Sequence, residues 1–100
     1  MKKDIFDQYV EKVCDLFSID KDQLFTKTKV REVSDARQLL YYLCVKRPMQ
    51  PCYVEKFMCE NGYKITHSTI LHGVRSVTQK VLDDEDYRTM VRQIENSVFI

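Results

Sequence analysis

The chain has 100 residues, of which 44% are hydrophobic and 31% charged, so it is large enough for one hydrophobic core and is not a disordered chain. Two Gly and two Pro are too few for the many tight turns of a β-fold, and no apolar run approaches a membrane span or a secretory signal. A net charge of +1 indicates no partner by itself, and we expect one all-α domain over residues 1–100, located in the cytoplasm.

The first two expected helices occupy residues 4–25. Residues 4–17 carry apolar side chains at helical spacings of three and four: Ile5, Phe6, Tyr9, Val10, Val13, Leu16 and Phe17. Asp20 is the expected N-cap of a short turn over residues 21–25.

A basic loop and a long helix follow. Residues 26–33 (TKTKVREV) alternate cations with small or β-branched residues and have no apolar stripe, which predicts a loop. Ser34 is the expected N-cap of a helix that ends at Pro48. The residues expected to face inward from this helix are Leu39, Leu40, Leu43 and Cys44.

Two helices joined by a tight turn are expected over residues 51–82, and a last helix closes the chain. Pro51 suits a first helical turn, and the apolar residues of this helix are Tyr53, Val54, Phe57 and Met58. Gly62 suits the position after its end, and Thr66 is the expected N-cap of a second helix running to about Leu82. This pair has the outline of a helix-turn-helix. The apolar tail at 98–100 and the oligomeric state are left open.

The second helix of this pair is expected to have a polar face without carboxylates. On a helical wheel its apolar side comprises Ile70, Leu71, Val74, Val77 and Val81. The opposite side comprises Ser68, His72, Arg75, Ser76 and Gln79, with Thr69 at the flank. Such a face suits phosphates and base edges, and the free N–H groups of the first turn favour an anion.

The charges of the chain are unevenly distributed. Residues 26–48 and 64–80 together hold nine basic and two acidic residues, a net charge of +7, while the remainder carries −6. This division is typical of a protein that turns a basic face toward a polyanion, and it also fits two ordinary solvated surfaces.

Catalysis and zinc binding are less well supported interpretations of the same residues. Ser68 and His72 are four residues apart, as a nucleophile and base would be, but no acid follows to orient the histidine, and His67 also fits a packing role at the helix start. The four cysteines lie in apolar helical stretches and are expected to be buried, reduced thiols rather than zinc ligands with His67 or His72. We expect no enzyme, no metal and no cofactor.

Two separated motifs resemble one protein family. Residues 66–77 (THSTILHGVRSV) resemble the signature of the C-terminal DNA-binding domain (domain IV) of the bacterial replication initiator DnaA, Asp-His-[Thr/Ser]-Thr-Val-[Leu/Ile]-His-Ala, followed two residues later by Lys. Residues 25–43 (FTKTKVREVSDARQLLYYL) resemble the basic loop and the next helix of that domain. The similarity spans roughly residues 8–95.

The resemblance implies an all-α, Trp-repressor-like domain with helix 66–82 in the major groove and loop 26–33 on the backbone and minor groove. By position, Arg37 and Gln38 match phosphate-contacting residues, Lys29 matches a minor-groove arginine, and residues 67–69 match the start of the recognition helix. With the charge pattern, the expected DNA-binding residues are Lys27, Lys29, Arg31, Arg37, Gln38, Lys46, Lys64, Thr66, His67, Ser68, Thr69, His72 and Arg75.

Three departures from the family pattern affect sequence choice rather than duplex binding. Thr66 replaces an aspartate that accepts hydrogen bonds from bases, Lys64 or Ile65 replaces the arginine before it, and the turn is longer. The ATPase part of the initiator has no counterpart in these 100 residues. We therefore expect a replication accessory or transcription regulator, of a kind that a phage could encode, that binds double-stranded DNA near the nucleoid, with replication or transcription proteins as further partners. The rival interpretation is a protein-interaction module that keeps the fold without DNA binding.

Overall fold

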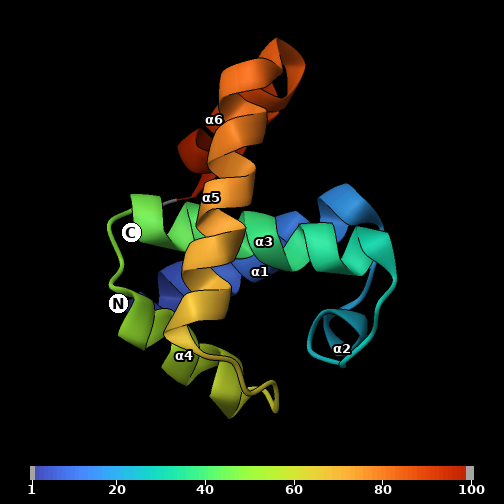
Figure 1. Cartoon of the computed structure of the whole chain (residues 1–100), viewed down its shortest axis with the longest axis vertical. Coiled ribbons are helices and arrows are strands. Elements are labelled where there is room, and N and C mark those ends of the chain that lie inside the picture. Colours follow the sequence, from blue (N-terminus) through green and yellow to red (C-terminus); the bar gives the residue numbers. More distant parts are fainter. Residues whose placement is uncertain (1, 99–100) are drawn as a thin grey trace.

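The computed structural model describes residues 2–98, and every regular element in this range is an α-helix. In chain order the elements are α1 (Lys2–Phe17), α2 (Lys21–Leu24), α3 (Arg31–Lys46), α4 (Pro51–Glu60), α5 (His67–Asp83) and α6 (Glu85–Ser97) (Figure 1). The expected all-α fold class is confirmed. No helix in the described range is long and apolar enough to cross a membrane.

Helix α3 is the central element of the fold. In Figure 1, α5 crosses in front of α3 and α1 lies behind it. The predicted inward residues of α3 are all fully buried: Leu39, Leu40, Leu43 and Cys44. Phe6 and Val13 of α1 meet them from behind and are also fully buried. Each such apolar side chain contributes about 1.5–3 kcal/mol relative to an exposed one, so this three-layer core fixes the position of α5.

Helix α5 crosses α3 at very short range, and Gly73 makes this approach possible. A Cβ atom at residue 73 would lie 2.9 Å from Cδ2 of Tyr41 and 3.3 Å from Cγ of Gln38. Real Cβ atoms essentially never come within 3.0 Å of another heavy atom, so a larger residue here requires the Tyr41 ring or the two helices to move. Ile70 and Val77, one turn to each side, are fully buried and anchor the crossing.

The caps predicted at Asp20 and Gly62 are present. The Asp20 side chain accepts from the Gln23 N–H at 2.8 Å, while Gln23 Oε1 accepts from the Asp20 N–H, which is a capping box. At the end of α4, Gly62 has φ +85°, its N–H donates to Cys59 O, and the next N–H donates to Met58 O. This is a Schellman motif, which satisfies the last carbonyls of α4 and turns the chain toward α5.

The N-cap predicted at Ser34 is wrong. Helix α3 begins at Arg31, with Val30 as the N-cap, and the Ser34 N–H already donates to Val30 O. The loop therefore covers residues 25–30, and Arg31 belongs to the helix rather than to the loop. Thr28 Oγ1 accepts from the Val30 N–H at 3.2 Å, a local bond that starts the helix earlier than the Ser34 signal indicated.

Several side chains expected to face inward are exposed instead. Leu16 and Tyr53 are 44% and 36% exposed, and Lys2 Nζ of α1 lies 4.7 Å from the centre of the Tyr53 ring. All four cysteines are free thiols; Cys14 and Cys44 are buried as expected, whereas Cys52 and Cys59 are exposed on α4.

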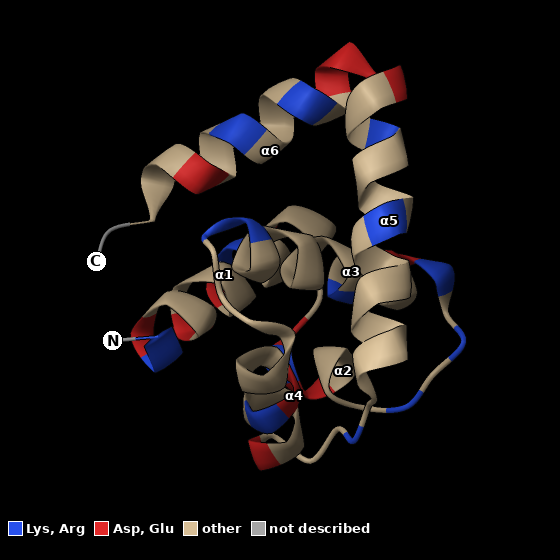
Figure 2. Ribbon diagram, turned by 60° about the vertical axis from the view of Figure 1, so that its left-hand side comes forward, with Lys and Arg blue, Asp and Glu red and all other residues tan. Residues whose placement is uncertain are grey.

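Helix α6 folds back from the far end of α5. Asp84 accepts from the Tyr87 N–H and caps α6, and the acidic residues of the elbow gather at one end of the molecule (Figure 2). Arg88 ties the elbow together because its Nε donates to Val81 O at 3.0 Å and its Nη2 donates to Leu82 O at 3.3 Å. Val98 is buried, while the tail residues 99 and 100, left open as a dimer contact, lie outside the described residues.

Candidate nucleic-acid interface

Helices α4 and α5 present the N-terminal end of α5 to solvent. After the Schellman turn, residues 63–66 lead to Thr66, whose Oγ1 accepts from the Thr69 N–H at 3.4 Å and caps α5 as predicted. His67, Ser68 and Thr69 are exposed. The remaining N–H groups of this first turn point toward solvent with the positive end of the helix dipole, which favours an anion or a base-edge acceptor.

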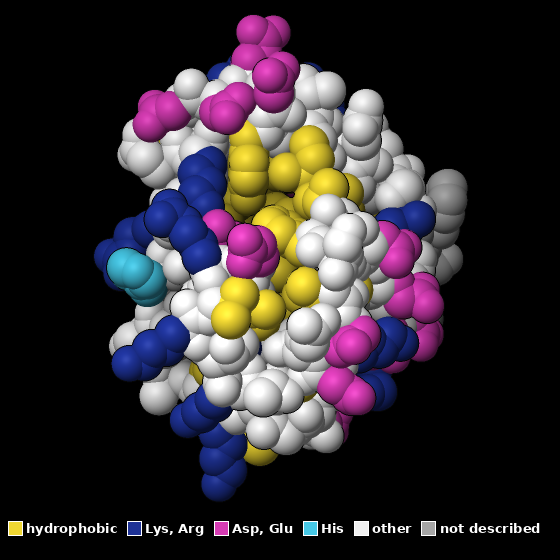
Figure 3. All heavy atoms as spheres, turned by 90° about the vertical axis from the view of Figure 1, so that its right-hand side faces the viewer, with side chains coloured by type: hydrophobic (Ala, Val, Ile, Leu, Met, Phe, Trp, Pro, Cys, Tyr) yellow, Lys and Arg dark blue, Asp and Glu magenta, His cyan; other side chains and the backbone are white. Residues whose placement is uncertain are grey.

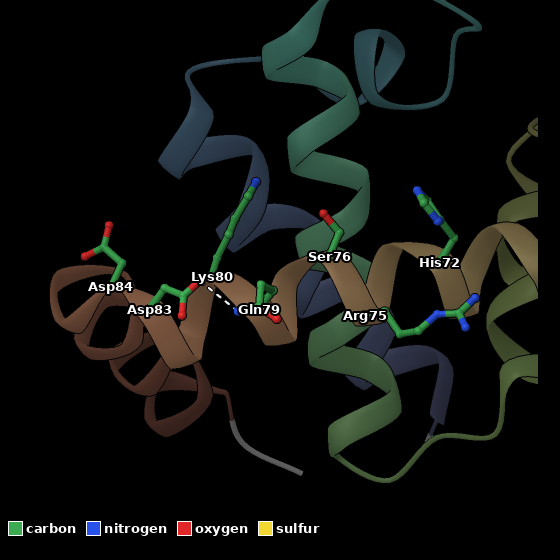
Figure 4. A pocket seen from close by; sticks show the side chains of 7 residues that line it. All are labelled: His72, Arg75, Ser76, Gln79, Lys80, Asp83 and Asp84. Carbon is green, nitrogen blue, oxygen red and sulfur yellow. Dashed lines mark hydrogen bonds between the residues drawn. The ribbon is translucent and has the colours of Figure 1, made fainter.

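The outer face of α5 is polar, as the helical wheel predicts, with one exception. His72, Arg75 and Gln79 are exposed, and Figure 4 shows the polar side chains following one another along the helix. Leu71 was expected to face the core but is 45% exposed, because α5 touches α3 through Gly73 and leaves the Leu71 side uncovered. The first half of α5 therefore offers hydroxyl, imidazole, guanidinium and one apolar side chain.

Carboxylates from neighbouring helices come closer to α5 than the sequence indicated. His67 Nε2 lies 3.5 Å from Oε2 of Glu55 on α4, so the first turn of α5 is joined to the preceding helix. Farther along, Lys80 Nζ lies 3.7 Å from Oδ1 of Asp35 on α3. The C-terminal end of α5 is acidic, where Asp83 accepts from Gln79 (Figure 4). Helix α5 itself carries no carboxylate before Asp83, but Glu55 of α4 lies against its first turn.

The basic loop exposes its two lysines. Lys27 and Lys29 are exposed, and the adjacent Arg31 side chain, 89% exposed, lies 3.9 Å from Asp35 in the first turn of α3. In Figure 3, Lys and Arg side chains gather along one edge of this face together with a histidine, while acidic side chains lie at the top, near the centre beside this edge, and on the opposite edge among further basic ones. A weak, solvent-exposed ion pair such as that of Arg31 leaves the guanidinium open to another anion.

The expected phosphate contact of Arg37 is corrected by the structure. Arg37 is 5% exposed, its Nε donates to Leu24 O at 2.7 Å, and its Nη2 donates to Thr26 O. Its guanidinium carbon lies 4.4 Å from the centre of the Tyr63 ring. The side chain joins the loop to the α4–α5 turn inside the protein and does not lie on the surface.

The remaining predicted site residues fall into two groups. Gln38 is half-buried beside Gly73 at the crossing, and Lys64 is exposed in the turn, so both border α5. Lys46 lies over the Tyr42 ring at the opposite end of α3 from the loop, roughly 23 Å away by the rise of a helix. The structure does not bring Lys46 together with the loop lysines.

Sequence reasoning missed two residues of this region. Tyr63 has no periodic signal because it lies in the turn, although its place directly after the helix-ending Gly62 is where an apolar contact is common. Lys80 was expected as part of the basic stretch but not as a site residue; it lies on the same face as His72 and Ser76 (Figure 4).

The enzymatic and metal readings gain no support from the geometry. Ser68 and His72 are both exposed, and within residues 2–98 no hydrogen bond joins them. In the same range no three His, Cys, Asp or Glu side chains gather as metal ligands would.

Comparison with known proteins gives one consistent result. The chain is 28% identical to the chromosomal replication initiator protein DnaA of Flavobacterium psychrophilum, over 98% of this chain and 20% of the relative. It is 30% identical to DnaA of Bacteroides thetaiotaomicron, over 90% of this chain and 18% of the relative, and 27% identical to that of Treponema denticola, over 86% and 18%. The chain thus spans about a fifth of the length of the curated relatives it matches. No family model and no solved structure matches it.

Proposed function

We propose that this DnaA domain IV-like protein binds double-stranded DNA. The chain is similar over nearly its whole length to the C-terminal region of the replication initiator DnaA. In this proposal α4 and α5 act as a helix-turn-helix, and the first two turns of α5 enter the major groove. The activities of the rest of the initiator are not part of the proposal, because the similarity covers only about a fifth of those proteins.

One observation carries this proposal. The exposed first half of α5 has no carboxylate of its own and lies beside a loop whose lysines are exposed. Arg37 of α3 links the two segments, because it contacts the loop at Thr26 and the turn before α5 at Tyr63. A recognition helix beside a cationic loop can contact base edges and the phosphate backbone of a duplex at the same time.

We assign the two kinds of contact to different residues. Ser68, Thr69 and His67 lie in the first turn of α5, where side chains reach base edges, although His67 must first exchange its partner Glu55 for a base. The exposed cations of the loop, the start of α3, the turn and α5 supply backbone contacts: Lys27, Lys29, Arg31, Lys64 and Arg75. Lys29 is the candidate for the minor groove.

The acidic elbow limits the length of α5 that meets DNA. Asp83 and Asp84 lie at the C-terminal end of α5, followed by Glu85 and Asp86 at the start of α6 (Figure 2). Phosphates are repelled there, so we place only the N-terminal half of α5 in the groove. Gln79 and Lys80 then lie outside the contact.

Salt dependence tests the proposal with a matched pair of lysines. Three to five phosphate contacts predict a log–log slope of affinity against salt of about −3 to −4. Lys27→Ala should make that slope shallower by about one unit, whereas Lys12→Ala should not, because Lys12 is an exposed lysine on α1, behind α3. A slope indistinguishable from zero for the unmodified protein would refute DNA binding.

The cellular role is proposed from the similarity alone. A DNA-binding domain related to a replication initiator serves replication or local transcription, and we propose a nucleoid-associated replication accessory or transcription regulator. Recovery of origin fragments after crosslinking supports the first role, and recovery of promoter fragments supports the second.

A protein-interaction role is the second candidate, because a patch of hydrophobic side chains is exposed on one face of the molecule, among charged ones. In Figure 3, hydrophobic side chains gather in a hollow beside the basic edge, and Leu82 and Val30 are 66% and 51% exposed. A partner held by such a surface would bind with almost no dependence on salt, which separates this function from DNA binding.

A further inference from the structure

One side chain of α3 supplies the long-range hydrogen bonds to the end of α2 and the basic loop, beside the packing of Leu24 and Phe25 on the core. In residues 2–98, the hydrogen bonds that reach residues 24–30 from more than five residues away both come from Arg37 of α3: Nε to Leu24 O at 2.7 Å and Nη2 to Thr26 O. The other bonds of the segment are local, such as Thr26 Oγ1 to Asp22 O and the Val30 N–H to Thr28 Oγ1. Local bonds shape the loop but do not fix where it lies relative to α5.

The opposite side of the same guanidinium faces the turn that leads into α5. Its carbon atom lies 4.4 Å from the centre of the Tyr63 ring, within the range of a cation–π contact. Tyr63 is itself fixed, because its N–H donates to Met58 O in the Schellman motif. Arg37 thus contacts the loop with its edge and the turn with its face.

This double contact requires an arginine. The planar guanidinium donates two hydrogen bonds in its plane while its face stacks on a ring, whereas a lysine ammonium cannot do both from one position. Arg37 is 5% exposed, and in the structure its charge is met by carbonyls and a ring rather than by solvent. A residue placed in this way acts on DNA through the elements it holds.

We propose that Arg37 is a positioning residue that fixes the basic loop relative to the N-terminal turn of α5, so that loop and helix contact a duplex at the same time. The inference rests on the proposed DNA binding, and it reassigns Arg37 from a phosphate contact to a clamp between two DNA-contacting segments. Loss of the clamp leaves both segments present but uncoupled.

A double-mutant cycle on DNA affinity measures this coupling. Lys29→Ala is made in the unmodified protein, in Arg37→Lys, and in Arg88→Lys. Arg88 is the matched control because its guanidinium also donates to two carbonyls, Val81 O and Leu82 O, but at the α5–α6 elbow. Both arginine variants keep their charge and lose a pair of bonds to main-chain carbonyls, which in Arg88 are more exposed than in Arg37.

The expected result separates positioning from general stability. Lys29→Ala should weaken binding about fivefold in the unmodified protein and in Arg88→Lys, but less than about twofold in Arg37→Lys, because the freed loop no longer delivers its lysine to the duplex. Equal losses in all three backgrounds would overturn the proposal.

A second readout needs no DNA and keeps the inference separate from the proposed function. Trypsin cleavage after Lys27 and Lys29 becomes faster when the loop leaves its place more often, so Arg37→Lys should be cut there about tenfold faster than Arg88→Lys. Tyr63→Leu should also speed this cleavage, and Tyr63→Phe, which keeps the ring, should not. If the unmodified protein fails to bind DNA, faster cleavage still supports the clamp, and equal cleavage in all variants refutes it.

Discussion

The close crossing of α3 and α5 predicts that Gly73→Ala destabilises the protein. Inside a free helix this substitution is favourable by about 1 kcal/mol, because glycine loses more backbone entropy than alanine. Here the new Cβ would lie 2.9 Å from Cδ2 of Tyr41, whose residue is 2% exposed, and 3.4 Å from the Gln38 Cα. Overpacking of this kind costs about 1–3 kcal/mol. We therefore expect the free energy of unfolding to fall by about 1 kcal/mol.

Urea unfolding followed by circular dichroism measures this effect, and a second background tests its cause. In Tyr41→Leu the nearest ring is absent, so Gly73→Ala should become neutral or stabilising there, and the two substitutions should couple by about 1–2 kcal/mol. A Gly73→Ala variant that is about 1 kcal/mol more stable than the unmodified protein would refute the close crossing. Gly73→Ala also restores the residue of the family signature, which has alanine at this position.

Three further predictions follow from the same geometry. Val74→Asp should lower the free energy of unfolding by about 3 kcal/mol or more, because Val74 packs on the core. Leu71→Asp, at a side chain that is 45% exposed, should leave the midpoint of urea unfolding nearly unchanged. Lys29→Arg should increase the preference for A·T-rich flanking sequence, because arginine loses less hydration than lysine on entering a narrow minor groove. Competition between duplexes measures this preference, and an unchanged preference would show that the loop does not lie in the minor groove. Burial raises the pKa of Tyr87 to about 12. An unfolded tyrosine titrates near pH 10, so the folded state holds more protons in this window and its stability should fall as the pH rises from about 10 to 12, an effect that Tyr87→Phe should reduce in urea titrations.

The sequence predicts features that depend on neighbouring residues along the chain. The Asp20 and Thr66 caps and the Gly62 turn follow from short patterns, because each cap bonds to an N–H or carbonyl within a few residues. The buried stripe of α3 also follows from spacing alone. Ser34 is the exception, since Val30 and Thr28 start that helix one turn earlier.

The sequence does not predict features that depend on which helix covers which face. Leu71 lies on the apolar side of a helical wheel, but α5 turns Gly73 toward α3 and leaves Leu71 in solvent. Arg37 lies in a stretch rich in basic residues, which predicts an exposed cation. In the structure it is buried and donates hydrogen bonds to the carbonyls of Leu24 and Thr26. Lys46 lies in the same basic stretch, at the other end of α3. Charge counts along a chain cannot distinguish the outcomes for Arg37 and Lys46, and the helical wheel cannot show that Leu71 is left exposed.

Selection of bound fragments from a random duplex library tests the central claim, that the first turn of α5 reads DNA. The unmodified protein, Ser68→Ala and Thr66→Asp should each be selected at the same salt concentration. Thr66→Asp keeps an N-cap and adds an acceptor for cytosine N4, so it should shift one position of the selected sequence toward C·G while stability stays near that of the unmodified protein. Ser68→Ala should relax selection at a neighbouring position, at a cost of about 1–3 kcal/mol on the preferred site. Identical selected sequences from all three proteins would contradict the claim.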